Sequence, residues 1–82
     1  MSKLTGGALE WLAVQADVLY LSDLRPQYRT HALTRSLRRA LEWVDPERFP
    51  AASWCDAVEY LLDRPCRGLT AVQAATLLRG EL

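Results

Sequence analysis

The chain has 82 residues, half of them hydrophobic, and its ten basic side chains balance its ten acidic ones. This length predicts a single domain over residues 1–82, and this hydrophobic content excludes a disordered chain, which would need low hydrophobicity and high net charge. The zero net charge disfavours a dedicated electrostatic binder of nucleic acid, because such proteins normally carry an excess of lysine and arginine.

The first predicted helix spans about residues 6–22, with Thr5 as its N-cap and Pro26 beyond its end. Its apolar side chains fall on two faces when they are placed at about 100° per residue. The second of these faces consists of Trp11, Val14, Val18 and Leu21. A helix that is apolar on two sides is either central in its bundle or carries a partner surface. We therefore expect this second face to bind a protein partner or a second copy of the chain.

Three further helices are predicted at about residues 30–44, 53–63 and 70–79, with a short extra turn near 46–49. Each of them carries an apolar face, and in the first two the apolar residues recur at three- and four-residue spacing. Pro46 and Pro65 mark breaks between the predicted helices, and Thr70 with Gln73 matches a capping box. No segment alternates with period two over the length of a strand. The prediction is an all-α fold, a compact bundle of four main helices.

The charges are sorted along the chain. Five arginines and no acidic residue lie between Asp23 and Glu42, whereas six acidic residues accompany Arg48 alone from Glu42 to Asp63. On the helix at 30–44, a basic ridge faces away from the apolar stripe; it consists of His31, Arg35, Arg38 and Arg39. The simplest interpretation is a solvated face. The basic and acidic blocks can also pair within the molecule or between two copies.

The two cysteines are interpreted as thiols. Two are too few for a disulfide scaffold, and Cys55 and Cys66 lack the Cys-x-x-Cys spacing of a structural zinc site. We expect Cys55 to pack at a helix margin and Cys66 to lie in a loop, where Arg64 and Arg67 favour its thiolate and make it the one candidate for reactivity. Neither a signal peptide nor a membrane span is expected, which predicts a reduced, cytoplasmic protein.

No catalytic, cofactor-binding or metal site is predicted. His31 is the single histidine, the glycines form no phosphate-binding loop, and no carboxylate pair matches an acid–base motif. The sequence favours a non-enzymatic interaction or accessory domain with a protein partner or a second copy, and with no membrane or small-molecule ligand. The alternative is a small nucleic-acid-associated regulator that binds phosphates through the basic ridge. Size and composition also suit an accessory protein of a bacterium or a mobile element.

Overall fold

The computed structural model describes residues 7–18 and 20–82. Its regular secondary structure consists of four α-helices and two short 3-10 helices: α1 (Ala8–Gln15), η1 (Leu21–Leu24), α2 (His31–Trp43), η2 (Pro46–Arg48), α3 (Ala51–Leu62) and α4 (Ala71–Glu81). The described residues contain no strand, and the prediction of an all-α bundle with four main helices is confirmed. Within those residues, none of the helices has the length and apolar character that crossing a membrane requires.

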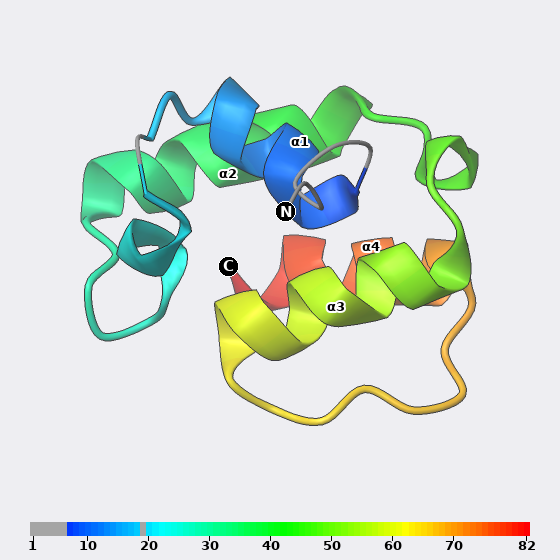
Figure 1. Cartoon of the computed structure of the whole chain (residues 1–82). Helices are drawn as coiled ribbons and strands as arrows, with labels where there is room; N and C mark the ends of the chain where they lie inside the picture. Colours follow the sequence, from blue (N-terminus) through cyan, green and yellow to red (C-terminus); the bar gives the residue numbers. More distant parts are fainter. Residues whose placement is uncertain (1–6, 19) are drawn as a thin grey trace.

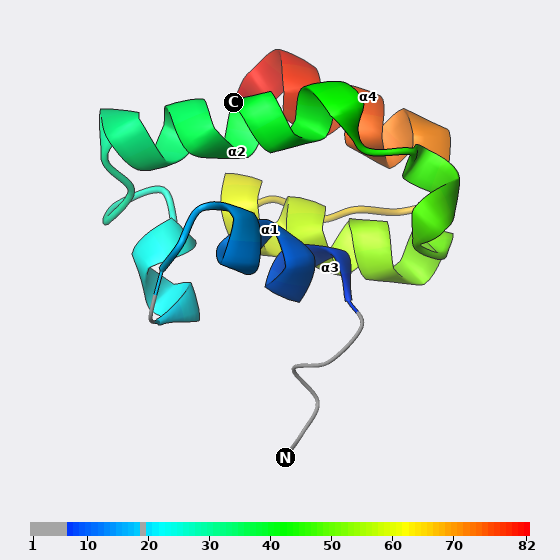
Figure 2. The ribbon, with the colours of Figure 1, turned by 90° about the horizontal axis from the view of Figure 1, so that it is seen from above.

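The four helices form two layers, with α1 and α2 above α3 and α4 (Figure 1). Viewed from above, α1 and α3 lie on one side and α2 and α4 on the other (Figure 2). The main helix packing agrees with this arrangement, because α1 contacts α2 and α3 while α4 contacts α3 and α2. The helices α2 and α3 are therefore diagonal to each other. Their solvent-facing sides point toward opposite sides of the molecule.

One hydrophobic cluster joins the four helices. Its largest side chain is Trp54 of α3, which is fully buried and donates a hydrogen bond from Nε1 to the carbonyl oxygen of Pro46 at 2.7 Å. Fully buried leucines reach this cluster from every layer: Leu12, Leu24, Leu37, Leu41, Leu61 and Leu78. The apolar stripes expected on α2, α3 and α4 supply most of the core, which is why these three helices were predictable from their spacing.

The first helix ends at Gln15, well before the predicted end near residue 22. Asp17 adopts a left-handed conformation with φ of 59°. The N–H of Asp17 donates to the oxygen of Val14 at 3.1 Å and that of Val18 to the oxygen of Ala13 at 3.2 Å, the two hydrogen bonds of a Schellman motif. This turn brings Val18 back against the core. The predicted cap at Thr5 and the start at residue 6 lie outside the described residues.

Side-chain hydrogen bonds satisfy backbone groups at the starts of α1 and α4. The hydroxyl of Ser53 on α3 accepts a hydrogen bond from the backbone N–H of Ala8 at the start of α1, at 2.7 Å. Within α4, the capping box of Thr70 and Gln73 forms as predicted. The bounds of two helices differ slightly from expectation, since α3 begins at Ala51 after Pro50, and α4 continues through Gly80.

The cysteines form a disulfide, so their interpretation as separate thiols is wrong. The Cα atoms of Cys55 and Cys66 lie 5.4 Å apart, and their sulfur atoms are bonded. Glu59, one turn after Cys55 on α3, accepts a hydrogen bond from the backbone N–H of Cys66 at 3.3 Å. These contacts hold the α3–α4 loop along α3 (Figure 1). Left-handed residues at Asp63 and Gly68 bend the loop, and this path through space is not visible in the spacing of the cysteines.

Candidate interaction surface

The structure does not present the predicted apolar face as one exposed surface. Val14 is 72% exposed, and Trp11 is half-buried. Val18 and Leu21 are partly buried and pack against the hydrophobic core, because the chain turns after α1. Of the four predicted contact residues, only Trp11 and Val14 remain together on α1 itself.

Trp43 is the most exposed of the tryptophans, at 63%, and it is the last residue of α2. Its ring meets the ring of Trp11 edge-on, with centroids 5.6 Å apart. The series continues inward from Trp11 to Phe49 at 6.0 Å and from Phe49 to the buried Trp54 at 5.8 Å. Aromatic pairs of this kind contribute about 0.5–1.5 kcal/mol beyond area burial. Trp43 is therefore an exposed ring held in place by a series of rings that reaches the core.

Arg48 covers part of Trp11. Its guanidinium lies 5.6 Å from the ring centroid of Trp11 and 5.7 Å from that of Phe49. Cation–π contacts at exposed sites contribute about 0.5–1 kcal/mol. Because Arg48 and Trp43 both contact Trp11, the accessible aromatic anchor is Trp43. Trp43 is not among the predicted contact residues, and its position at the end of an amphipathic helix was the available signal.

A shallow hollow lies between α1 and α2 beside Trp43. Its volume is about 260 Å³, and its lining residues are Gln15, Ser36, Arg39, Ala40 and Trp43. A second hollow of about 270 Å³ is lined by Arg35, Arg38, Arg39 and Glu42. Since Arg39 lines both, the aromatic anchor and the basic ridge are continuous. We call this region the α1–α2 surface; its residues are Gln15, Arg35, Arg38, Arg39 and Trp43.

The predicted basic ridge lies on the outward face of α2. Its four residues are all exposed: His31, Arg35, Arg38 and Arg39. Among the described residues the ion pair present is Arg64–Glu81, with nitrogen and oxygen 3.2 Å apart, and it involves none of the four. Glu42 lies one turn from Arg38 without pairing to it. The ridge thus keeps its positive charge within the part of the chain that the structure describes.

Arg29, which precedes the ridge in the sequence, has a structural role instead. Its Nη1 donates to the carbonyl oxygens of Leu24 at 2.7 Å and Leu61 at 2.8 Å, and its Nε donates to the hydroxyl of Thr34 at 3.2 Å. Partial burial lowers the pKa of Arg29, because desolvation disfavours the charged form. Arg29 therefore ties η1 to the end of α3 and is not available to a ligand.

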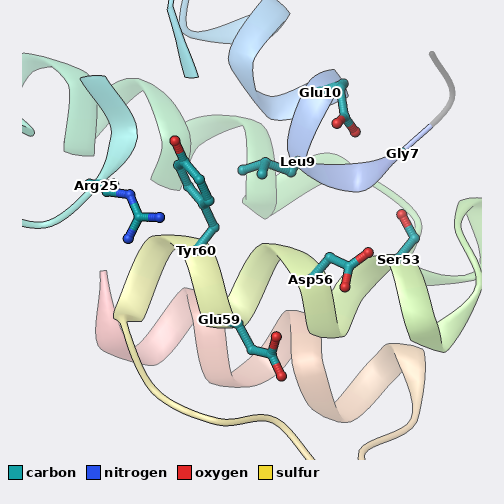
Figure 3. Close-up of a pocket in the computed structure, with 8 residues that line it drawn as sticks. All are labelled: Gly7, Leu9, Glu10, Arg25, Ser53, Asp56, Glu59 and Tyr60. Carbon is teal, nitrogen blue, oxygen red and sulfur yellow. The ribbon is translucent and has the colours of Figure 1, made fainter. Parts of the chain in front are cut away.

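A larger hollow lies across the molecule from the ridge, between the start of α1 and the exposed side of α3 (Figure 3). Its volume is about 580 Å³. Three carboxylates and one guanidinium line it, those of Glu10, Asp56, Glu59 and Arg25. The Arg25 guanidinium sits 4.5 Å from the ring centroid of Tyr60, which forms part of the wall. We call this hollow the acidic cleft.

One hydroxyl beside the acidic cleft takes part in capping α1. The hydroxyl of Ser53 at its edge already accepts the N–H of Ala8 at 2.7 Å. His31, the single histidine, begins α2, and α2 is diagonal to the α3 side of the cleft. Within residues 7–18 and 20–82, no three His, Cys, Asp or Glu side chains are grouped so that they could hold a metal ion.

Comparisons of the chain with family models, with curated proteins and with solved structures gave no match. The geometry of the α1–α2 surface and of the acidic cleft is therefore the basis for a functional proposal.

Proposed function

We propose that this chain is a small non-enzymatic interaction domain that binds a protein partner, or a second copy of itself, through the α1–α2 surface. The observation that carries this proposal is Trp43, which is 63% exposed although Trp11 holds its ring edge-on. Interface hot spots are enriched in tryptophan and arginine, and a ring that is already held in place loses little side-chain entropy on binding. Arg39 beside Trp43 supplies the second of these residue types.

Binding to single-stranded nucleic acid is the second candidate. Bases stack on exposed aromatic rings while arginines neutralise phosphates, and Trp43 lies next to Arg39 on one surface. Two features oppose it. Glu42 lies in the same hollow as Arg35 and Arg38, and the chain has no net charge to attract a polyanion. We therefore favour the protein partner.

We still propose a cytoplasmic location, although the disulfide removes one argument for it. It relied partly on reduced cysteines, whereas Cys55 and Cys66 are bonded in this structure. Disulfides persist mainly in oxidising compartments. The redox state of this pair in the source cell therefore bears directly on where the protein resides.

The proposed function predicts that Trp43→Glu weakens partner binding. Tagged protein would be used to capture partners from a lysate of the source cell, after nuclease treatment, with quantitative mass spectrometry. We expect the wild type to retain its partners and Trp43→Glu to capture at least about 10-fold less of them. A charge introduced at a residue that is buried in an interface typically costs about 2 kcal/mol or more of binding free energy.

Tyr28→Glu is the matched control, because Tyr28 is also 63% exposed but lies outside the α1–α2 surface. It should retain the same partners, and circular dichroism should show that both variants are folded. Equal retention by Trp43→Glu would contradict the proposal. Partners that disappear with nuclease, together with retention of the wild type on single-stranded DNA at low salt, would favour the second candidate.

A further inference from the structure

The basic ridge and the acidic cleft have opposite sign and lie on opposite sides of the molecule. The basic ridge projects from α2, and the acidic cleft lies between α1 and α3. Because α2 and α3 are diagonal in the bundle, their outward faces point away from each other (Figure 2). A single molecule therefore cannot bring Arg35 or Arg38 to the cleft without unfolding.

Neither feature is neutralised by ion pairs in the described residues. The ion pair found there, Arg64–Glu81, joins the α3–α4 loop to the end of α4 and belongs to neither feature. In the cleft, Glu59 accepts one backbone hydrogen bond from Cys66, and Arg25 faces the Tyr60 ring. The carboxylates of Glu10 and Asp56 have no hydrogen-bond donor in the described residues.

The side chains of the two features also complement each other. The ridge carries long basic side chains on the outer side of a helix, whereas the cleft is a hollow of about 580 Å³. Arginine can bind a carboxylate through two parallel hydrogen bonds, and its aliphatic stem packs along apolar surface. The cleft offers both, because Leu9 and Tyr60 lie among its carboxylates (Figure 3).

We propose that the acidic cleft of one molecule binds the basic ridge of a second copy, so that the chain associates head to tail. This inference rests on the proposed function and names a second copy as the partner. The contact joins two different surfaces and is therefore heterologous, and every added copy still presents a free ridge or a free cleft. The assembly closes into a ring or continues as an open series. A net charge of zero removes the overall repulsion between copies.

The strength of this contact depends on salt. Exposed ion pairs are individually weak and are screened by dissolved ions. We expect association at high protein concentration and low ionic strength. The association constant should fall at least about 10-fold between about 20 and 300 mM NaCl.

The test uses two neutralised variants and sedimentation velocity. The ridge variant carries Arg35→Gln, Arg38→Gln and Arg39→Gln, and the cleft variant carries Glu10→Gln, Asp56→Asn and Glu59→Gln. The last change keeps an oxygen that accepts the N–H of Cys66. At low salt the wild type should form species that grow with concentration, whereas each variant alone should be monomeric. An equimolar mixture should give a dimer that grows no further, because one intact ridge meets one intact cleft.

Arg67→Gln and Glu47→Gln serve as controls, since both side chains are exposed and lie outside the two features. Each should associate like the wild type. A wild type that stays monomeric at about 1 mM in low salt overturns the proposal, as does a mixture that stays monomeric. A wild-type dimer that does not grow also overturns it, because that indicates a symmetric contact.

The outcome separates this inference from the proposed function. A monomeric wild type that still retains a Trp43-dependent protein partner overturns the head-to-tail contact alone. If Trp43→Glu captures every protein partner as well as the wild type does, and copies of the chain do not associate, the proposed function itself is overturned.

Discussion

At the scale of single residues, seven of the nine arginines of this chain divide into three groups. Arg29 and Arg79 turn toward the backbone and donate to carbonyl oxygens. Arg25 and Arg48 lie against aromatic rings. The ridge arginines remain exposed and without ion-pair partners in the described residues. Helix periodicity identifies the last group, because it predicts the outward face of α2. It does not identify the first, because the contacts to Leu61, Leu41 and Val44 join elements far apart along the chain.

Arg79 provides a residue-scale prediction. Its Nε donates to the oxygen of Leu41 at 2.6 Å and its Nη2 to the oxygen of Val44 at 3.3 Å, so it satisfies carbonyls at the end of α2 from a different helix. Hydrogen bonds from charged groups contribute about 1.5–3 kcal/mol. We expect Arg79→Met to lower the free energy of unfolding by that amount in urea denaturation, with Arg79→Lys in between.

Arg35→Met is the matched control, because it removes the same charge from an exposed position on α2. Its effect on the free energy of unfolding should stay within about 0.5 kcal/mol, as is usual for surface substitutions. Equal effects at the two positions would show that Arg79 does not secure the end of α2.

At the scale of elements, the early end of α1 decides what the predicted apolar face becomes. A continuous helix through residue 22 would present Val18 and Leu21 on the same exposed side as Val14. The left-handed residue Asp17 ends the helix instead, and the chain carries both side chains to the core. Aspartate tolerates this conformation better than most residues, but it is a weak signal beside the usual glycine. The burial of Val18 and Leu21 is therefore decided by tertiary packing.

The disulfide provides a prediction for the α3–α4 loop. The bond joins residues 11 positions apart. Cross-linking a loop of this length restricts the unfolded chain and stabilises the fold by about 3 kcal/mol. We expect the double variant Cys55→Ser, Cys66→Ser to lose this amount in urea denaturation compared with the oxidised wild type. The reduced wild type should resemble the variant.

A thiol assay in denaturant checks the chemistry behind this prediction. The oxidised protein should show no free thiol, and two should appear after reduction. Two free thiols before reduction would contradict the pairing. The same assay on protein alkylated inside the source cell reports whether the compartment keeps the pair oxidised.

At the scale of the whole molecule, the sequence was sufficient for the features that depend on local pattern. The apolar stripe with Leu37 and Leu41 predicted α2, and the Thr70–Gln73 box predicted the start of α4. The candidate surface was only partly predictable. The ridge followed from the same periodicity, whereas Trp43 became its anchor because α1 brings Trp11 beside it. The acidic cleft joins Glu10 to Asp56 across two helices, and no spacing along the chain indicates that approach.

The separation of charge across the molecule predicts how salt affects stability. If the basic and acidic blocks paired within one molecule, screening would weaken those pairs and lower the free energy of unfolding. Here the ridge arginines lie three and four residues apart without paired carboxylates, and such like-charge neighbours destabilise a helix by about 0.2–0.5 kcal/mol each. We therefore expect the unfolding free energy of the monomer to stay constant or rise slightly between about 20 and 300 mM NaCl. Urea denaturation at low micromolar protein concentration, where copies stay apart, measures the effect of salt on the monomer alone. A fall of more than about 1 kcal/mol would show that the two blocks stabilise the monomer by pairing with each other, which would also remove the charge available to a second copy.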